Sequence, residues 1–144
     1  ASFVERAPAA VRTFSEQTSE VPVDFGVESC KPLGEGEIGY QFELGGEGYA
    51  LRAPGRHNVL NAVAAISVAL DLGMTPAEVR AGLMDCLLPP QRLDVHLEGD
   101  VLFIDDSYNA NPGSMESAFD TFAELSLQHP GGRRIAVLGR KPGG

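Results

Sequence analysis

Residues 105–114 have the sequence Asp105-Asp106-Ser107-Tyr108-Asn109-Ala110-Asn111-Pro112-Gly113-Ser114. An apolar run, Val101-Leu102-Phe103-Ile104, precedes them, and apolar residues at helical spacing follow: Met115, Ala118, Phe119, Phe122 and Leu125. This pattern predicts a strand, a polar loop and a helix. Open α/β sheets bind ligands at such loops, because the free N–H groups and the dipole of the helix favour anions there. The alternative is an ordinary turn with Asn111 or Ser114 as the N-cap and Pro112 as the first helical residue.

The composition narrows the class of protein. The chain has 144 residues, enough for one domain or two small ones. Its hydrophobic content of 43% and charged content of 22% are ordinary for a globular protein. The formal net charge of -9 argues against a nucleic-acid-binding surface, but a local arginine or helix N-terminus can still hold phosphates. No apolar run approaches the length of about 18 residues that a membrane span needs.

Several kinds of chemistry have no counterpart in the sequence. Cys30 and Cys86 are far apart and form no C-x-x-C pair, which favours reduced thiols in a cytoplasmic protein. The chain contains no G-x-x-x-x-G-K-[ST] phosphate-binding loop and no cluster of His and Cys residues at metal-ligand spacing. We therefore assign no metal site and no catalytic residue to this chain.

The first part of the chain predicts short strands. Residues 1–12 suggest a short helix or connector, 11–15 a strand, 16–24 a loop, and 25–33 a weak strand. Ile38, Tyr40, Phe42 and Leu44 then alternate with polar or small residues, and Gly45-Gly46 turns the chain into residues 49–53. Alternation on both sides of a glycine turn predicts a β-hairpin with one buried face. We expect this hairpin to serve packing rather than chemistry.

Two helices should follow the hairpin. Residues 56–70 are apolar nearly all round after the first turn, which predicts a buried helix that ends at Gly73. Thr75-Pro76-Ala77-Glu78 is a capping box with proline in the first position, so a second helix begins there. Its apolar stripe consists of Val79, Leu83, Cys86 and Leu87. Pro89-Pro90 cannot continue a helix, and we place a boundary there between two domains, residues 1–89 and 90–144.

The second part predicts a βαβ unit. Residues 93–97 and 101–104 suggest strands around a turn, and the helix after the loop extends to about residue 127. Residues 134–138 are again strand-like, so this strand and 101–104 should be parallel. A parallel strand normally continues into a loop and helix, and the chain begins with Ala1 rather than Met. We therefore expect a piece of a longer protein.

Polar residues begin the first predicted helix. Asn58 and Asn61, at positions i and i+3, lie on one face, and their amides together can contact the edge of a purine base. The alternative is that one asparagine caps the helix and the other faces solvent. His57 beside them could orient the preceding loop, stack on a ring, or be purely structural.

Two more polar residues stand at points where packing does not require them. Arg92 directly follows the proline pair, where a guanidinium can reach a phosphate between two domains or form a salt bridge. Asp106 ends the strand before the loop, where a carboxylate can accept hydrogen bonds from ribose hydroxyls. Its neighbour Asp105 is expected to be structural or to face solvent.

Three motifs together resemble the Mur ligase family. Gly55-Arg56-His57-Asn58-Val59-Leu60-Asn61-Ala62-Val63-Ala64-Ala65 is similar to the family motif G-x-H-N-x-x-N-x-x-A-A, and Pro90-Gln91-Arg92 resembles the P-x-R element at the hinge to the C-terminal domain. Residues 105–114 resemble the D-D-S-Y-N-A-N-P-x-S motif. That motif is typical of the branch that adds D-alanyl-D-alanine to UDP-N-acetylmuramoyl-tripeptide. The resemblance begins near residue 38, but residues 140–144 depart from the branch.

The resemblance implies an α/β fold. It implies the C-terminal part of the central domain, a β-hairpin with buried helices, followed by the start of a Rossmann-like C-terminal domain. It also implies an ATP-dependent amide ligase of peptidoglycan precursor synthesis, with ATP and Mg²⁺, that works through an acyl phosphate. By family position, Asn58 and Asn61 would contact adenine, Arg92 phosphate and Asp106 ribose. A nucleotide or substrate loop would include His57, Tyr108, Asn109 and Asn111.

The resemblance also sets limits. Family members carry the phosphate-binding loop and the Mg²⁺ ligands upstream of the matching region, so we expect the isolated chain to be inactive. We expect a cytoplasmic monomer whose longer form binds UDP-N-acetylmuramoyl-tripeptide and D-Ala-D-Ala. A non-catalytic nucleotide-binding or regulatory module with the same fold is an alternative. Folylpolyglutamate synthetase and cyanophycin synthetase are others, and Tyr108-Asn109-Ala110-Asn111 argues against both.

Overall fold

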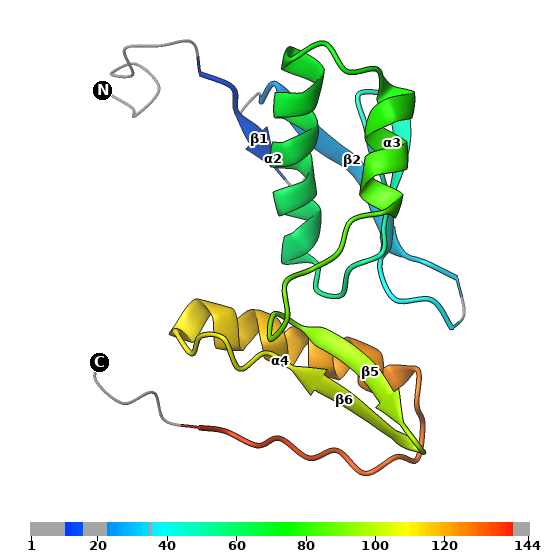
Figure 1. Cartoon of the computed structure of the whole chain (residues 1–144), viewed down its shortest axis with the longest axis vertical. Helices are drawn as coiled ribbons and strands as arrows, with labels where there is room; N and C mark the ends of the chain where they lie inside the picture. The colour runs from blue at the N-terminus through cyan, green and yellow to red at the C-terminus, as the bar shows by residue number, and fades with distance from the viewer. Residues whose placement is uncertain (1–10, 16–22, 35, 140–144) are drawn as a thin grey trace.

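A computed structural model of the chain describes residues 11–15, 23–34 and 36–139 (Figure 1). Most of the short helix expected in residues 1–12, and most of the loop expected in 16–24, lie outside these ranges. The elements are β1 (Phe14–Ser15), β2 (Phe25–Pro32), β3 (Tyr40–Leu44), β4 (Glu47–Leu51), α2 (His57–Asp71), α3 (Pro76–Met84), β5 (Asp94–Glu98), β6 (Val101–Asp105) and α4 (Pro112–Leu127). Helices and strands thus combine as the expected α/β class requires.

The first part of the described chain, from β1 to α3, contains a four-stranded sheet in the order β1-β2-β3-β4. β1 pairs with β2 in parallel, and β2, β3 and β4 form an antiparallel meander. On β3 the side chains of Tyr40, Phe42 and Leu44 are buried, whereas Gln41 and Glu43 are exposed. The predicted β-hairpin with one buried face is therefore confirmed.

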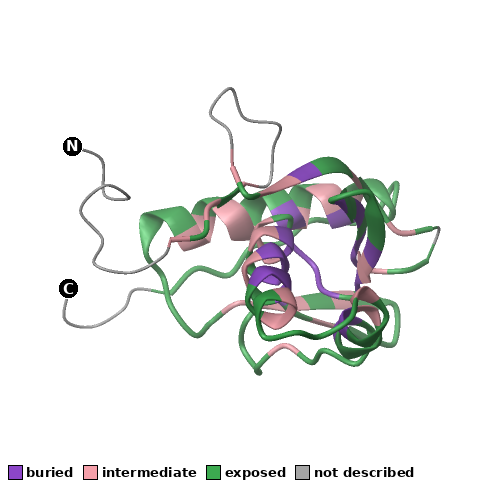
Figure 2. Cartoon of the chain, turned by 90° about the horizontal axis from the view of Figure 1, so that it is seen from above, coloured by how far each residue is buried: buried purple, intermediate pink, exposed green. Residues whose placement is uncertain are grey.

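The helix α2 packs on this sheet beside α3 and buries one face (Figures 1 and 2). Val59, Val63 and Ile66 are each at most 1% exposed in that face. Burial all round the helix, which the apolar sequence predicted, is wrong: Ala65 is exposed, and Val68 is 59% exposed. The reason is that the sheet and α3 cover only one side of α2.

The helix α3 begins as predicted and ends earlier than predicted. The Thr75 hydroxyl accepts a hydrogen bond from the Glu78 amide, and the Glu78 carboxylate accepts hydrogen bonds from the Thr75 amide and hydroxyl at 2.8 and 2.7 Å. The helix ends at Met84, so Cys86 and Leu87 do not extend its apolar stripe and are both exposed. Proline disfavours helical geometry only in the residue before it, here Leu88, so Pro89 does not account for the earlier end at Met84.

The capping box gives a first prediction. Thr75→Ala is expected to lower the free energy of unfolding by about 1 kcal/mol, because it leaves an amide at the start of α3 without its acceptor. Thr75→Ser keeps the hydroxyl and is the matched control in urea denaturation. The hydrogen bonds from the Thr75 amide and hydroxyl lower the pKa of Glu78. The stability that this carboxylate contributes is therefore lost as the pH falls through that lowered pKa. A Thr75→Ala variant as stable as Thr75→Ser would contradict the prediction.

The second part of the described chain, from β5 onward, contains the antiparallel β5–β6 hairpin, with α4 beside it (Figure 1). The Asn111 side chain accepts a hydrogen bond from the Ser114 amide at 2.9 Å, and Pro112 occupies the first helical position. Of the two predicted N-caps, Asn111 is thus the one used. The strand, polar loop and helix predicted around residues 105–114 are confirmed.

The strand predicted at residues 134–138 is not formed, so the parallel pairing with β6 and the βαβ unit are wrong for this structure. Ile135 and Val137 are 64% and 92% exposed. A parallel strand is normally covered on both faces by helices. Among the described residues one helix, α4, accompanies the β5–β6 hairpin, so these apolar side chains gain little from pairing.

The two parts differ in how much apolar surface they bury. The main cluster of buried side chains comes from residues 27–83, and the buried residues after it are Leu93, Thr121 and Leu125. A domain boundary at residues 89 and 90 stays a prediction.

Of the helices that the structure describes, none has the length and apolar composition required to cross a bilayer.

Candidate functional site

The connector between the two parts, residues 91–93, is fastened to the loop that follows β6. The Leu93 amide donates a hydrogen bond to Asp106 Oδ1 at 3.1 Å, and the Tyr108 amide donates one to the Gln91 carbonyl at 3.1 Å. Gln91 and Leu93 have φ values of 63° and 51°, in the left-handed region that non-glycine residues rarely occupy. Such geometry persists only where neighbouring contacts hold it, and it is frequent at ligand sites.

Arg92 stands between these two residues and stacks on an aromatic ring. Its guanidinium carbon lies 4.1 Å from the centre of the Tyr108 ring. Within residues 11–15, 23–34 and 36–139, no carboxylate pairs with the Arg92 guanidinium. Both side chains are exposed, so the cation is available to an anion from solvent.

The connector also touches the loop before α2. A Cβ on Gly55 would lie 2.7 Å from Leu93 Cδ1 and 2.6 Å from His57 Cε1, so both side chains pack directly on the Gly55 backbone. Leu93 is only 3% exposed. The structure therefore brings the start of α2 against the connector that carries Arg92 and is bonded to Asp106.

The two helix-start asparagines are bonded to each other. Asn61 Nδ2 donates to Asn58 Oδ1 at 3.0 Å, and Asn58 Nδ2 donates to the Pro54 carbonyl at 2.8 Å. The Asn58 amide nitrogen thus binds the loop before α2, and its amide oxygen orients Asn61. Neither caps α2, whose N-cap is Arg56 without a side-chain hydrogen bond. Asn61 is the exposed member of the pair.

The loop after β6 uses several of its polar side chains internally. Hydrogen bonds from the Ser107 hydroxyl and amide lower the pKa of Asp105, the residue expected to be structural. Asn109 Oδ1 accepts from the Ala110 amide at 3.0 Å, and Asn111 caps α4. Asp106 uses one carboxylate oxygen to hold Leu93. Tyr108, also in this loop, provides the ring on which Arg92 stacks.

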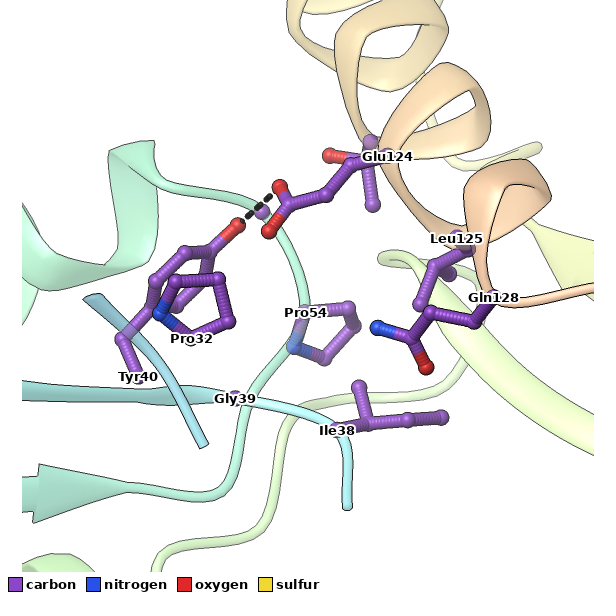
Figure 3. A pocket seen from close by; sticks show the side chains of 10 residues that line it. Pro32, Ile38, Gly39, Tyr40, Pro54, Glu124, Leu125 and Gln128 are labelled. Atoms are coloured by element: carbon purple, nitrogen blue, oxygen red, sulfur yellow. Dashed lines mark hydrogen bonds between the residues drawn. The ribbon is translucent and has the colours of Figure 1, made fainter. Parts of the chain in front are cut away.

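A pocket separate from these residues lies between the first part and α4 (Figure 3). Its lining includes Pro54 and Gly55 but none of the eight predicted site residues. At its edge the Tyr40 hydroxyl donates a hydrogen bond to Glu124 Oε2 at 2.5 Å. Burial, followed by this contact, raises the pKa of Tyr40 well above its ordinary value. The bond joins β3 to α4, and sequence reasoning missed it because 84 residues separate the partners and neither stands in a motif.

The polar side chains of the candidate site suit a nucleotide better than a metal ion. In the described part of the chain, no group of three or more His, Cys, Asp or Glu side chains is placed to hold a metal. We therefore assign no Mg²⁺ ligand to these residues. An exposed arginine, a carboxylate and a pair of amides are instead the groups that bind phosphate, ribose and base.

The chain is similar in sequence to part of two ligases. It is 38% identical over 104 residues to UDP-N-acetylmuramoyl-tripeptide--D-alanyl-D-alanine ligase of Escherichia coli, a match that covers 72% of this chain and 22% of that enzyme. It is 38% identical over 135 residues to UDP-N-acetylmuramate--L-alanine ligase of Chlorobaculum tepidum, covering 91% of this chain and 28% of that enzyme. No protein-family model matches the chain.

A solved structure shares the fold. MurF from Acinetobacter baumannii superposes with a TM-score of 0.66 and 31% identity, covering 83% of this chain and 25% of that one. The chain thus spans about a quarter of the length of the relatives it matches. Sequence and fold agree with the three motifs, and the chain belongs to the Mur ligase family.

Proposed function

We propose that this chain supplies the adenine, ribose and phosphate contacts of the ATP site in an amide ligase of peptidoglycan precursor synthesis. The observation that carries the proposal is that residues 91–93 contact both the loop after β6 and the loop before α2. Asp106 bonds to Leu93, Arg92 stacks on Tyr108, and Leu93 packs on Gly55 at the start of α2. These contacts join residues in or beside three separate sequence motifs, which supports a shared site, and the names of the relatives support the same chemistry.

Each residue has a role that suits its position. Arg92 would donate paired hydrogen bonds to phosphate oxygens, and the second carboxylate oxygen of Asp106 would accept a hydrogen bond from a ribose hydroxyl. Asn61, oriented by Asn58, would contact the edge of adenine. Mg²⁺, when bound, would supply neutralisation of phosphate charge, and none of the residues described is assigned to it.

The substrates follow from the branch. The D-D-S-Y-N-A-N-P stretch and the Escherichia coli relative favour addition of D-alanyl-D-alanine to UDP-N-acetylmuramoyl-tripeptide over the L-alanine ligase reaction. We further propose a division into domains at residues 89 and 90, and a cytoplasmic monomer. A non-catalytic module is the second candidate. It differs from an enzyme in whether the longer protein containing this chain forms an amide bond at the expense of ATP.

ATP titration of the ¹⁵N-labelled chain tests the proposal. Millimolar ATP is expected to shift the amide signals of Asn61, Arg92, Asp106 and Tyr108, without hydrolysis, because the sequence contains no phosphate-binding loop. Asp106→Asn keeps an oxygen for the Leu93 amide but loses the charge. It should therefore weaken ATP binding by about 1 kcal/mol and should not weaken the binding of ribose-free tripolyphosphate.

A second charge-removing variant serves as the control. Asp120→Asn, on α4 outside the site, makes the same charge change and should leave ATP binding as it is. Amide shifts confined to other regions would contradict the proposal, as would equal ATP affinity in the Asp106→Asn variant and the parent chain. Real turnover of ATP by the isolated chain would overturn the expectation that it is inactive alone.

A further inference from the structure

We propose that Tyr108 is the positioning residue for Arg92, holding its guanidinium toward a polyphosphate without using any of its hydrogen-bond donors. The inference rests on the proposed function for the identity of the anion. Its structural basis is independent: the ring contact at 4.1 Å and the hydrogen bond from the Tyr108 amide to the Gln91 carbonyl. Tyr108 therefore contacts both the side chain of Arg92 and the backbone just before it.

The type of contact determines what Arg92 can do. A carboxylate partner would occupy some of the five N–H donors of the guanidinium and would compete with phosphate. An aromatic face attracts the cation through its quadrupole and leaves the donors at the edge of the guanidinium available. The arginines Arg12, Arg52 and Arg80 contrast with it, because each of them pairs with a carboxylate. Arg92 is thus held in a way compatible with anion binding.

The backbone of the connector restricts Arg92 further. Both of its neighbours have left-handed φ values, and both are bonded to the loop after β6. These bonds fix the backbone on both sides of Arg92, so the guanidinium can leave the Tyr108 ring only by rotation about its own side-chain bonds. Because the chain has a net charge of -9, an anion is repelled on average, and a pre-oriented local cation matters more.

The first measurement needs no ligand. The ring current of Tyr108 should shift the NMR signals of the Arg92 side-chain Hδ and Hε protons upfield. Tyr108→Phe retains the ring and should retain the shift, whereas Tyr108→Leu should abolish it. An Arg92 side chain with the same signals in the Tyr108→Leu variant and the parent chain would overturn the inference.

The second measurement is calorimetric titration of the chain with inorganic tripolyphosphate at low salt. Arg92→Ala should weaken binding by about tenfold or more, because it removes charge-assisted hydrogen bonds. Tyr108→Leu should weaken it by about two- to fivefold, and Tyr108→Phe should restore it. Arg80→Ala removes a positive charge that lies on α3 and pairs with Glu47 of β4, and it serves as the charge control.

The outcomes separate the two ideas. If Arg92→Ala weakens binding and Tyr108→Leu does not, the positioning role is overturned and the proposed phosphate contact stands. If Arg92→Ala binds tripolyphosphate as tightly as the parent chain, the phosphate contact of the proposed function is overturned. The role of Tyr108 in anion binding is then overturned as well. A loss for Tyr108→Phe equal to that for Tyr108→Leu would mean that the hydroxyl rather than the ring matters, which also overturns the inference.

Discussion

Gly39→Ala is expected to destabilise the chain by about 3–5 kcal/mol, or to prevent cooperative folding. Gly39 precedes β3, is buried, and has a φ of 135°. A Cβ there would lie 2.1 Å from the Leu51 carbonyl oxygen and 3.0 Å from Arg52 Cα. These are backbone atoms, so no side-chain rotation can relieve the collision. The Gly39 carbonyl also accepts the Leu33 amide at 3.0 Å, so a shift would disturb the end of β2 as well.

Urea denaturation followed by circular dichroism measures this loss. Gly48→Ala in β4 is the matched control, because Gly48 is exposed and a Cβ there would meet nothing within 4 Å. Alanine fits a strand better than glycine, so this variant should be unchanged or more stable by up to about 1 kcal/mol. Comparable stability of the two variants would contradict the close approach of Gly39 to β4.

Local sequence signals predicted most of the elements. The alternation in β3, the capping box of α3 and the Asn111-Pro112 start of α4 each depend on residues within a few positions of one another. Their physical causes are therefore visible in a single stretch of chain. The resemblance to Mur ligases added the family, which the comparisons bear out.

The predictions that failed depend on what covers a surface. Residues 134–138 have a strand-like composition, and α2 is apolar on nearly every side. Apolar composition predicts burial only if another layer is present. In the described residues no layer covers the Ala65 and Val68 side of α2 or the side chains of Ile135 and Val137.

The candidate site was predictable as a set of residues but not as a geometry. The sequence placed Arg92 after two prolines and Asp106 after a strand. It gave no sign that Gln91 and Leu93 adopt left-handed backbone angles, since neither is glycine or asparagine. Those angles are accompanied by hydrogen bonds to residues 13 or more positions away, among them the bond from Leu93 to Asp106, and such contacts are not visible in a local pattern.

Gly55→Ala is expected to destabilise the chain by about 2–4 kcal/mol, the sum of a backbone cost and a packing cost. Gly55 has a φ of 82°, which is unfavourable for any residue with a Cβ. The added methyl group would lie 2.7 Å from Leu93 Cδ1, and Leu93 is 3% exposed and cannot move into free space. Because Leu93 is bonded to Asp106, its displacement should reach the candidate site.

Gly73→Ala separates the two costs. Gly73 has a φ of 88°, and a Cβ there would meet nothing within 4 Å, so alanine should cost only the backbone part, about 1–2 kcal/mol. In ¹⁵N spectra Gly55→Ala should shift the amide signals of Leu93 and Arg92, and Gly73→Ala should leave them in place. If both variants lose equal stability and both preserve the Leu93 signal, Leu93 does not pack on Gly55. The start of α2 and the Arg92 connector would then have to act as separate sites, because this contact is what brings them together.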